Sequence, residues 1–295
     1  MFDVFRQVSG VLITVFVVSS LLNVGLTQKP TNFRRHLRKT HFLSRMLLAN
    51  LVLVPAVMVM AVQVVDLEPI YAAGLVVFGL SAGAPFLIAL TRESKNDVAL
   101  AATVMTVLIV GTVLLMPVLL PRLIEGVTVD VWAIVWAMVS QMILPMVLGM
   151  AVRQHFVPVA AAVQPWVARI SSVALYGLLG TMIVGYLPEM ADPELWKAIV
   201  TGLVVILIAL FIGFMMGDGH NKLKKVGALA TAQRNTAAAM IVAGTNFDDP
   251  RVVVVVTLVN TFGLILLMAA AKAMSRDAEL LLTPIGADVP ERRRR

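Results

Sequence analysis

The chain has no cysteine and few charged residues. Of its 295 residues 14% are charged, whereas about a quarter of the residues are charged in a typical soluble domain. The absence of cysteine excludes disulfides, thiol nucleophiles, iron–sulfur clusters and cysteine-ligated metal sites. The four histidines are scattered without the spacing of metal ligands, so a metal centre is not expected. This composition does not fit a soluble enzyme.

The sequence contains several long apolar segments. Hydrophobic residues make up 59% of the sequence, and a membrane-spanning helix needs about 20 mainly apolar residues. We therefore predict an all-α integral membrane protein with about nine transmembrane helices. The first predicted span lacks a basic leader and a small-residue cleavage site, so we expect it to be retained. The nine spans cover residues 5–27, 43–65, 68–91, 97–121, 128–150, 163–187, 193–217, 223–246 and 251–274.

The basic residues predict the orientation in the membrane. When the nine spans alternate in direction, nineteen of the 24 Lys and Arg residues fall on one side, beginning with six in the loop 28–45. Lys and Arg collect in cytoplasmic loops, so the N-terminus is predicted outside and the C-terminus in the cytoplasm. The formal net charge of +7 then reflects topology, and no nucleic-acid partner is expected. A bacterial inner membrane is the expected location.

The spans divide the chain into one transmembrane domain and a tail. Residues 1–274 form the transmembrane transporter domain, and residues 275–295 form a basic cytoplasmic tail that ends in four arginines. With 128–150 as a connector helix, the segments 5–121 and 163–274 become two halves of opposite orientation. Such inverted halves are typical of secondary transporters.

Two predicted spans are interrupted by residues that do not favour a membrane helix. Proline removes a backbone donor and glycine permits unwinding, and polar groups in hydrocarbon mark candidate functional sites. Broken segments at matching positions of two halves indicate a transport site, although proline and glycine kinks also occur in ordinary membrane helices. The candidate residues are Ser81, Gly83 and Pro85 in the third span and Thr231, Gln233, Arg234, Asn235 and Thr236 in the eighth.

At these two stretches the sequence resembles the bile acid:sodium symporter family, and the correspondence runs to about Met274. The matching segments are 81–85 followed by 95–100, and 229–235; Pro55 and the set Gln141, Pro145 and Gly149 also sit where the family places similar residues. The resemblance implies a panel domain and a core domain, with two discontinuous helices that cross in the core. It also implies alternating access by movement of one domain against the other.

The sequence departs from the family at the positions of its sodium ligands. Leu87 and Ile88 stand at the Ser-Asn positions, Ala101 and Met105 at the hydroxyl positions, and Leu229 at the glutamate position. A hard cation needs several oxygen ligands, which these side chains do not supply. Gln233 is retained, and Asn50 stands where the family has a second-span glutamine. Sodium coupling through the usual sites is therefore not expected, which leaves coupling to protons, to an ion at another site, or no coupling.

Arg234 introduces a positive charge near the expected crossing. A guanidinium at this depth must find an anion, a group of carbonyls or water. One interpretation is that Arg234 binds an anionic group of the substrate together with Gln233, Asn235 and Thr236. The other is that Arg234 replaces the cation and holds the broken helices together through carbonyl contacts. Asn260 in the ninth span is a further candidate for lining the cavity.

The sequence thus predicts a secondary transporter of a small organic anion. Alternatives are a sodium-coupled, bile-acid-like symporter with a displaced ion site, and a non-transporting membrane receptor or scaffold derived from a transporter. An arsenite carrier would need a cysteine in the first interruption, and an enzyme would need a carboxylate or histidine deep in a span; the sequence has neither. No cofactor is expected, and the partners are the anionic substrate and the lipid bilayer. Substrate identity and oligomeric state are left open.

Overall fold

The computed structural model describes residues 2–28, 35–124, 131–185, 189–217 and 219–280. Within these ranges the regular structure is entirely helical, which confirms the all-α prediction. The tail beyond Leu280, with its four arginines, lies outside the described residues, as do loop residues 29–34 and 125–130. The last described helix, α14 (Arg251–Leu280), extends six residues past the predicted end of the transmembrane domain at 274.

Six stretches of the described chain are long and apolar enough to cross a membrane. Each overlaps one of the predicted spans, so the protein is an all-α membrane protein. Among the other predicted spans, 163–187 falls largely in α10 (Val157–Gly185), whereas 68–91 and 223–246 each contain two shorter helices. The count of nine spans stays a prediction. The six stretches are Gly10–Thr27, Thr40–Val65, Val98–Leu123, Ile134–His155, Pro193–Met216 and Arg251–Ser275.

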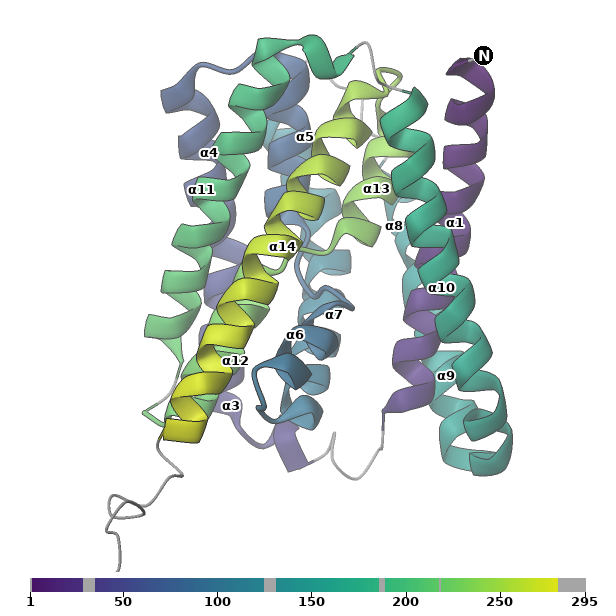
Figure 1. Cartoon of the computed structure of the whole chain (residues 1–295), viewed down its shortest axis with the longest axis vertical. Helices are drawn as coiled ribbons and strands as arrows, with labels where there is room; N and C mark the ends of the chain where they lie inside the picture. The colour runs from purple at the N-terminus through teal and green to yellow at the C-terminus, as the bar shows by residue number, and fades with distance from the viewer. Residues whose placement is uncertain (1, 29–34, 125–130, 186–188, 218, 281–295) are drawn as a thin grey trace, which may run out of the picture.

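Two groups of helices can be followed in Figure 1. In the first group, α1 (Phe2–Thr27) packs along α10 and α9 (Leu144–His155), and α8 (Val131–Met138) leads into α9 through the π-helical turn η2 (Val139–Ile143). The second group contains the remaining helices, with α14 packed against α5, α6, α11 and α13. Its other members are α3 (Thr40–Leu48), the π-helical turn η1 (Ala49–Leu53), α4 (Val54–Val65), α5 (Pro69–Leu80), α6 (Leu87–Glu93), α7 (Val98–Leu123), α11 (Pro193–Met216), α12 (Asn221–Ala232) and α13 (Thr236–Asn246).

The start of α1 and the end of α14 lie at opposite ends of the molecule (Figure 1). The end of α1 lies at the same end of the molecule as α3, α9 and the start of α12. α7 and α14 are more buried than the other spans. In the chain, these two helices follow the two spans that the sequence predicts to be interrupted, so a helix of the molecular interior follows each of them.

The backbone between α5 and α6 leaves the helical conformation at Ser81, which is extended with φ −86° and ψ 98°. Gly83 has a positive φ of 83°, and a Cβ atom there would lie 2.6 Å from the backbone nitrogen of Ile109. Glycine is therefore required both for its conformation and for the close approach of α7. Pro85 follows before α6 begins at Leu87. The residues that predicted an interruption are thus those at which the helix stops.

The backbone between α12 and α13 is non-helical over three residues, Gln233 to Asn235. The side chain of Asn235 accepts a hydrogen bond from the backbone nitrogen of Ala238 at 3.1 Å and so caps the start of α13. A short polar side chain at this position satisfies one of the free backbone donors of the new helix.

Candidate functional site

The two non-helical segments contact each other, although about 150 residues separate them in the chain. The backbone nitrogen of Asn235 donates to the carbonyl oxygen of Ser81 at 2.8 Å, and its side-chain amide donates to that of Gly83 at 2.9 Å. Thr112 of α7 supports the first segment, because its hydroxyl accepts from the nitrogen of Ala82 at 2.9 Å and contacts the oxygen of Ala82 at 3.1 Å. Backbone groups that the helices leave free are therefore paired across the interruptions.

Arg234 lies beside this junction and is 1% exposed. Its Nη1 donates to the side-chain oxygen of Asn50 at 2.8 Å and to the carbonyl oxygen of Thr231 at 3.4 Å. Its Nη2 donates to the carbonyl oxygens of Asn50 at 3.2 Å and of Gly79 at 2.5 Å. We call these four residues the Arg234 cluster. Among the described residues no carboxylate pairs with Arg234, so neutral oxygens surround the charge.

The polar residues around the cluster are largely paired with one another. The Asn50 amide donates to the Thr231 hydroxyl at 3.0 Å, and the Gln233 amide donates to the Asn260 oxygen at 3.2 Å. Two buried groups, Nε of Arg234 and the hydroxyl of Thr236, have no partner in the described part of the chain. In that part, no group of three or more histidines and carboxylates is placed to hold a metal ion.

The predicted site residues fall in two places. Those brought together in the buried interior are Asn50, Ser81, Gly83, Thr231, Gln233, Arg234, Asn235, Thr236 and Asn260. Pro85 instead borders a separate cavity. The structure thus unites residues from the second, third, eighth and ninth predicted spans, while their functional roles stay predictions.

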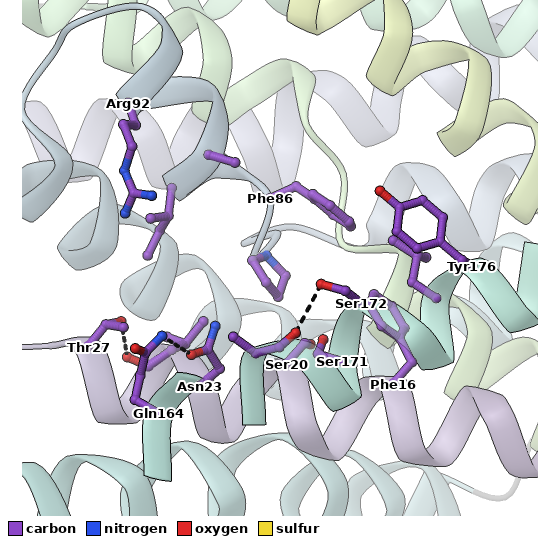
Figure 2. A pocket seen from close by; sticks show the side chains of 16 residues that line it. Phe16, Ser20, Asn23, Thr27, Phe86, Arg92, Gln164, Ser171, Ser172 and Tyr176 are labelled. Carbon is purple, nitrogen blue, oxygen red and sulfur yellow. Dashed lines mark hydrogen bonds between the residues drawn. The ribbon is translucent and has the colours of Figure 1, made fainter. Parts of the chain in front are cut away.

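That cavity has a volume of about 390 Å³ and lies between the two helix groups. One wall is formed by α1 and α10, and the other by α6 and the residues just before it. Figure 2 shows Asn23 and Gln164 on the first wall, joined by a hydrogen bond of 2.9 Å, and Arg92 on the second. The lining residues are Phe16, Ser20, Asn23, Val24, Thr27, Pro85, Phe86, Ile88, Ala89, Arg92, Gln164, Ala168, Ser171, Ser172, Leu175 and Tyr176.

Charge and polarity are unevenly distributed over this lining. Arg92 is the one charged side chain among the described lining residues, and the hydroxyl of Thr27 lies at the same end of the cavity (Figure 2). Phe16 and Phe86 face each other across the cavity with ring centroids 6.4 Å apart, and Tyr176 lies beyond them in the view. The cavity therefore offers a basic, polar end and an aromatic end.

Several residues of these sites carried no signal in the sequence that could be read as function. The Gly79 contact is made by a backbone oxygen, which every residue has, so only the three-dimensional structure reveals it. From the sequence, Arg92 is interpreted only as one of the basic residues of the cytoplasmic loops. Thr112 and the pair Ser171 and Ser172 are polar residues within apolar runs, which does not indicate function because such residues often bond within their own helix, as Ser172 does to Ala168.

The residues that the resemblance places at the family's sodium-ligand positions are apolar, and the structure buries four of the five. Leu87, Ala101, Met105 and Leu229 are all 1% exposed or less, and Ile88 borders the cavity. None of these side chains carries an oxygen atom. The loss of oxygen-bearing side chains at these positions therefore goes together with tight apolar packing.

A family model described as the Sodium Bile acid symporter family matches residues 14–192. The match covers more than half of the chain, including every residue that lines the cavity. The chain belongs to this family. Membership in the family is thereby confirmed, whereas the resemblance at 229–235 lies beyond the matched residues and stays a prediction. Membership identifies a membrane protein of the transporter type, in keeping with a role other than catalysis. No curated protein matches the chain.

Proposed function

We propose that the protein is a secondary transporter that binds a small organic anion in the cavity between its two helix groups. Arg92, the single charged residue among the described lining residues, carries the proposal. A guanidinium is suited to bind a carboxylate through two parallel hydrogen bonds. The amides of Asn23 and Gln164, at the same end of the cavity as Arg92 (Figure 2), supply further polar partners around the bound group.

The cavity's shape and lining support an amphipathic substrate. Its volume of about 390 Å³ lies toward the lower end of the range of about 300–1,000 Å³ for small-molecule sites. The carboxylate of such a substrate would face Arg92, and its apolar part would contact Phe16, Phe86 and Tyr176. This arrangement favours aliphatic or aromatic carboxylates over inorganic anions.

Alternating access is the proposed mechanism, with α1 and α8 to α10 forming a panel domain that moves against the remaining core. In this interpretation the pairs α5–α6 and α12–α13 are discontinuous membrane helices that cross within an inverted repeat. Two observations support it. α13 packs against α1 and α8, whereas a cavity separates α6 from α1 and α10. Closure of this cavity with separation of α13 from α1 would expose the site to the other side.

The proposed orientation has the N-terminus outside and the C-terminus inside a bacterial inner membrane. The cavity reaches Thr27 at the end of α1 and Arg92 near the end of α6. Arg38 and Lys39 precede α3, and Lys222, Lys224 and Lys225 lie in α12, at the same end of the molecule as the end of α1 (Figure 1). Basic residues favour the cytoplasmic side, so in this proposal the cavity opens inward, toward the cytoplasm.

Uptake into proteoliposomes tests the proposal. A series of monocarboxylates from acetate to benzoate would first be tested for thermal stabilisation of the purified protein, since a ligand of the native state raises its stability. Labelled forms of the stabilising anions would then be tested for flux. Arg92→Gln should weaken binding about 10-fold to 100-fold, because a hydrogen bond to a charged group contributes about 1.5–3 kcal/mol.

Arg169→Gln is the matched control, because Arg169 lies on the cavity-lining helix α10 but is exposed, contacts the Trp166 ring at 5.3 Å, and does not border the cavity. Equal weakening by both variants would contradict a site at Arg92. Binding without flux would identify the receptor alternative in place of a transporter.

A further inference from the structure

The Arg234 cluster is unusual because a buried positive charge is surrounded by neutral oxygen atoms. Three acceptors are backbone carbonyls, and the fourth is the side-chain oxygen of Asn50. A buried arginine is normally paired with a carboxylate, since an unpaired buried charge is costly. Carbonyl and amide oxygens without a carboxylate are instead ligands that suit a small hard cation.

Two of these carbonyls belong to the ends of helices. Gly79 is in the last turn of α5, which ends at Leu80, and Thr231 is in the last turn of α12, which ends at Ala232. The C-terminal end of a helix has free carbonyls and carries partial negative charge. Two such ends, from distant parts of the chain, therefore converge on one guanidinium, in the way that interrupted helices converge on a coupling cation.

The third carbonyl comes from a widened helical turn. Asn50 lies in the π-helical turn η1, and both its carbonyl and its side chain bind Arg234. π-Helical turns interrupt the regular pattern of backbone bonding and occur often at functional sites. The oxygen-rich site is thus assembled from three separate departures from regular α-helix.

We propose that Arg234 is a tethered cation that occupies, as part of the chain, the place of a bound monovalent cation. The guanidinium neutralises the helix ends of α5 and α12 permanently, so the core holds its arrangement without sodium. The functional consequence of this inference rests on the proposed transport function: a transporter with a tethered cation needs no coupling cation at this site. Arg234 does not border the cavity, and both of its terminal nitrogens are already bonded to the protein.

The test measures thermal unfolding of purified protein in NaCl, KCl or choline chloride at equal ionic strength. The wild-type midpoint should be the same in all three salts. Arg234→Ala should unfold several degrees lower in choline chloride, because it removes the charge and leaves a space. Methylguanidinium at millimolar concentration, or sodium at about 100 mM, should raise the midpoint of Arg234→Ala without affecting the wild type, since a ligand of the native state stabilises it.

Arg234→Met is the matched control, because it removes the charge but fills most of the space. Its midpoint should also be low, and neither cation should raise it. Arg234→Lys retains the charge and should unfold equally in the three salts, so it tests the proposal even where Arg234→Ala fails to fold. The comparison of the wild-type midpoint in the three salts tests the proposal without any variant.

Three outcomes would overturn the proposal: a wild-type midpoint that depends on sodium, an Arg234→Met protein as stable as the wild type, or an Arg234→Ala protein that neither cation stabilises. A carboxylate that stabilises the wild type and Arg92→Gln but not Arg234→Lys would assign Arg234 to substrate binding instead. The cation measurements contain no substrate. A failure of anion transport therefore contradicts the proposed function and leaves the tethered cation standing.

Discussion

Asn50 is the residue on which Arg234 depends most directly. Its side-chain oxygen and its carbonyl both accept from the guanidinium, while its amide donates to the carbonyl of Met46 and the hydroxyl of Thr231. This side chain is fully buried. Loss of one partner of a buried charged group leaves the other without compensation.

Asn50→Ala is therefore expected to lower the free energy of unfolding by about 1.5–3 kcal/mol, the range for a hydrogen bond to a charged group. Denaturant or thermal unfolding in detergent measures the change. Asn246→Ala serves as the control, because Asn246 is partly exposed at the end of α13 and bonds locally to Val242 and Thr245. Similar losses in both variants would show that the Arg234 contact contributes nothing beyond an ordinary local bond.

His36 lies between α1 and α3, outside the predicted spans, and is 2% exposed. Its Nε2 is 3.4 Å from Asp97, which also caps the start of α7. Burial lowers the pKa of His36 below its ordinary value of about 6.5; the nearby Asp97 carboxylate opposes this, while Lys39 and Arg35 add to it. The folded state therefore binds a proton less readily than the unfolded chain.

It follows that stability should fall as the pH decreases below about 6.5 toward the lower pKa of the folded state, because the unfolded chain takes up its proton first in that window. His36→Gln should make the unfolding midpoint less dependent on pH between about 7 and 5. His155→Gln, at an exposed position at the end of α9, should leave the pH dependence as it is in the wild type. A wild-type midpoint that rises on acidification would refute this assignment.

At the scale of elements, α1 and α9 approach so closely that their backbones touch. A Cβ atom on Gly25 would lie 2.9 Å from the Cα of Gly149, and one on Gly149 would lie 2.9 Å from the backbone nitrogen of Leu26. Small residues let membrane helices pack at short range, where van der Waals contact replaces the missing hydrophobic driving force. This pair of glycines joins α1 to α9 within the first helix group.

Gly25→Ala should separate the two helices and cost about 1–3 kcal/mol of stability, the range for overpacking. Gly10→Ala is a control on the same helix, since a Cβ atom there meets nothing within 4 Å. It should be neutral or slightly stabilising, because alanine favours the helix more than glycine does. Thermal unfolding of both variants measures the difference, and equal midpoints would show that the α1–α9 contact adapts.

The places where the helices stop could largely be predicted at this scale. Gly83 and Pro85 mark the first interruption, and Asn235 caps the helix that follows the second. The two π-helical turns could not be predicted by the same reasoning. Proline follows each closely, at Pro55 and Pro145, but a proline in a helix also permits a kink or an ordinary start, and packing decides among these.

At the scale of the whole molecule, the absence of cysteine makes accessibility directly measurable. Ala89 is exposed in the cavity wall on α6, whereas Asp248 is exposed in the segment between α13 and α14. If the cavity opens toward the cytoplasm, a membrane-impermeant thiol reagent should label Ala89→Cys from that side and Asp248→Cys from the other side. An anion bound in the cavity should slow the first reaction and leave the second unchanged.

Labelling in inside-out and right-side-out vesicles provides the comparison, with the cysteine-free wild type as the blank. Reaction of both cysteines from the same side would contradict the proposed orientation of the cavity. Reaction of Ala89→Cys from both sides at similar rates would instead indicate that inward-open and outward-open conformations are populated together.

The sequence alone determined that this is a helical membrane protein of a transporter family and where α5 and α12 end. These features depend on apolar run length, on backbone chemistry of glycine and proline, and on motifs that lie close together in the chain. It also limited Arg234 to two roles, because a buried guanidinium must find acceptors wherever it lies.

Only the tertiary structure decided which acceptors those are and where the cavity lies. The carbonyls of Gly79, Asn50 and Thr231 come from three separate elements, and backbone oxygens are the same in every residue, so no pattern of side chains could have predicted them. In the same way, Arg92 becomes a candidate substrate residue because α6 packs opposite α1 and α10. Contacts between distant segments decide both sites, and such contacts follow from packing of the whole chain.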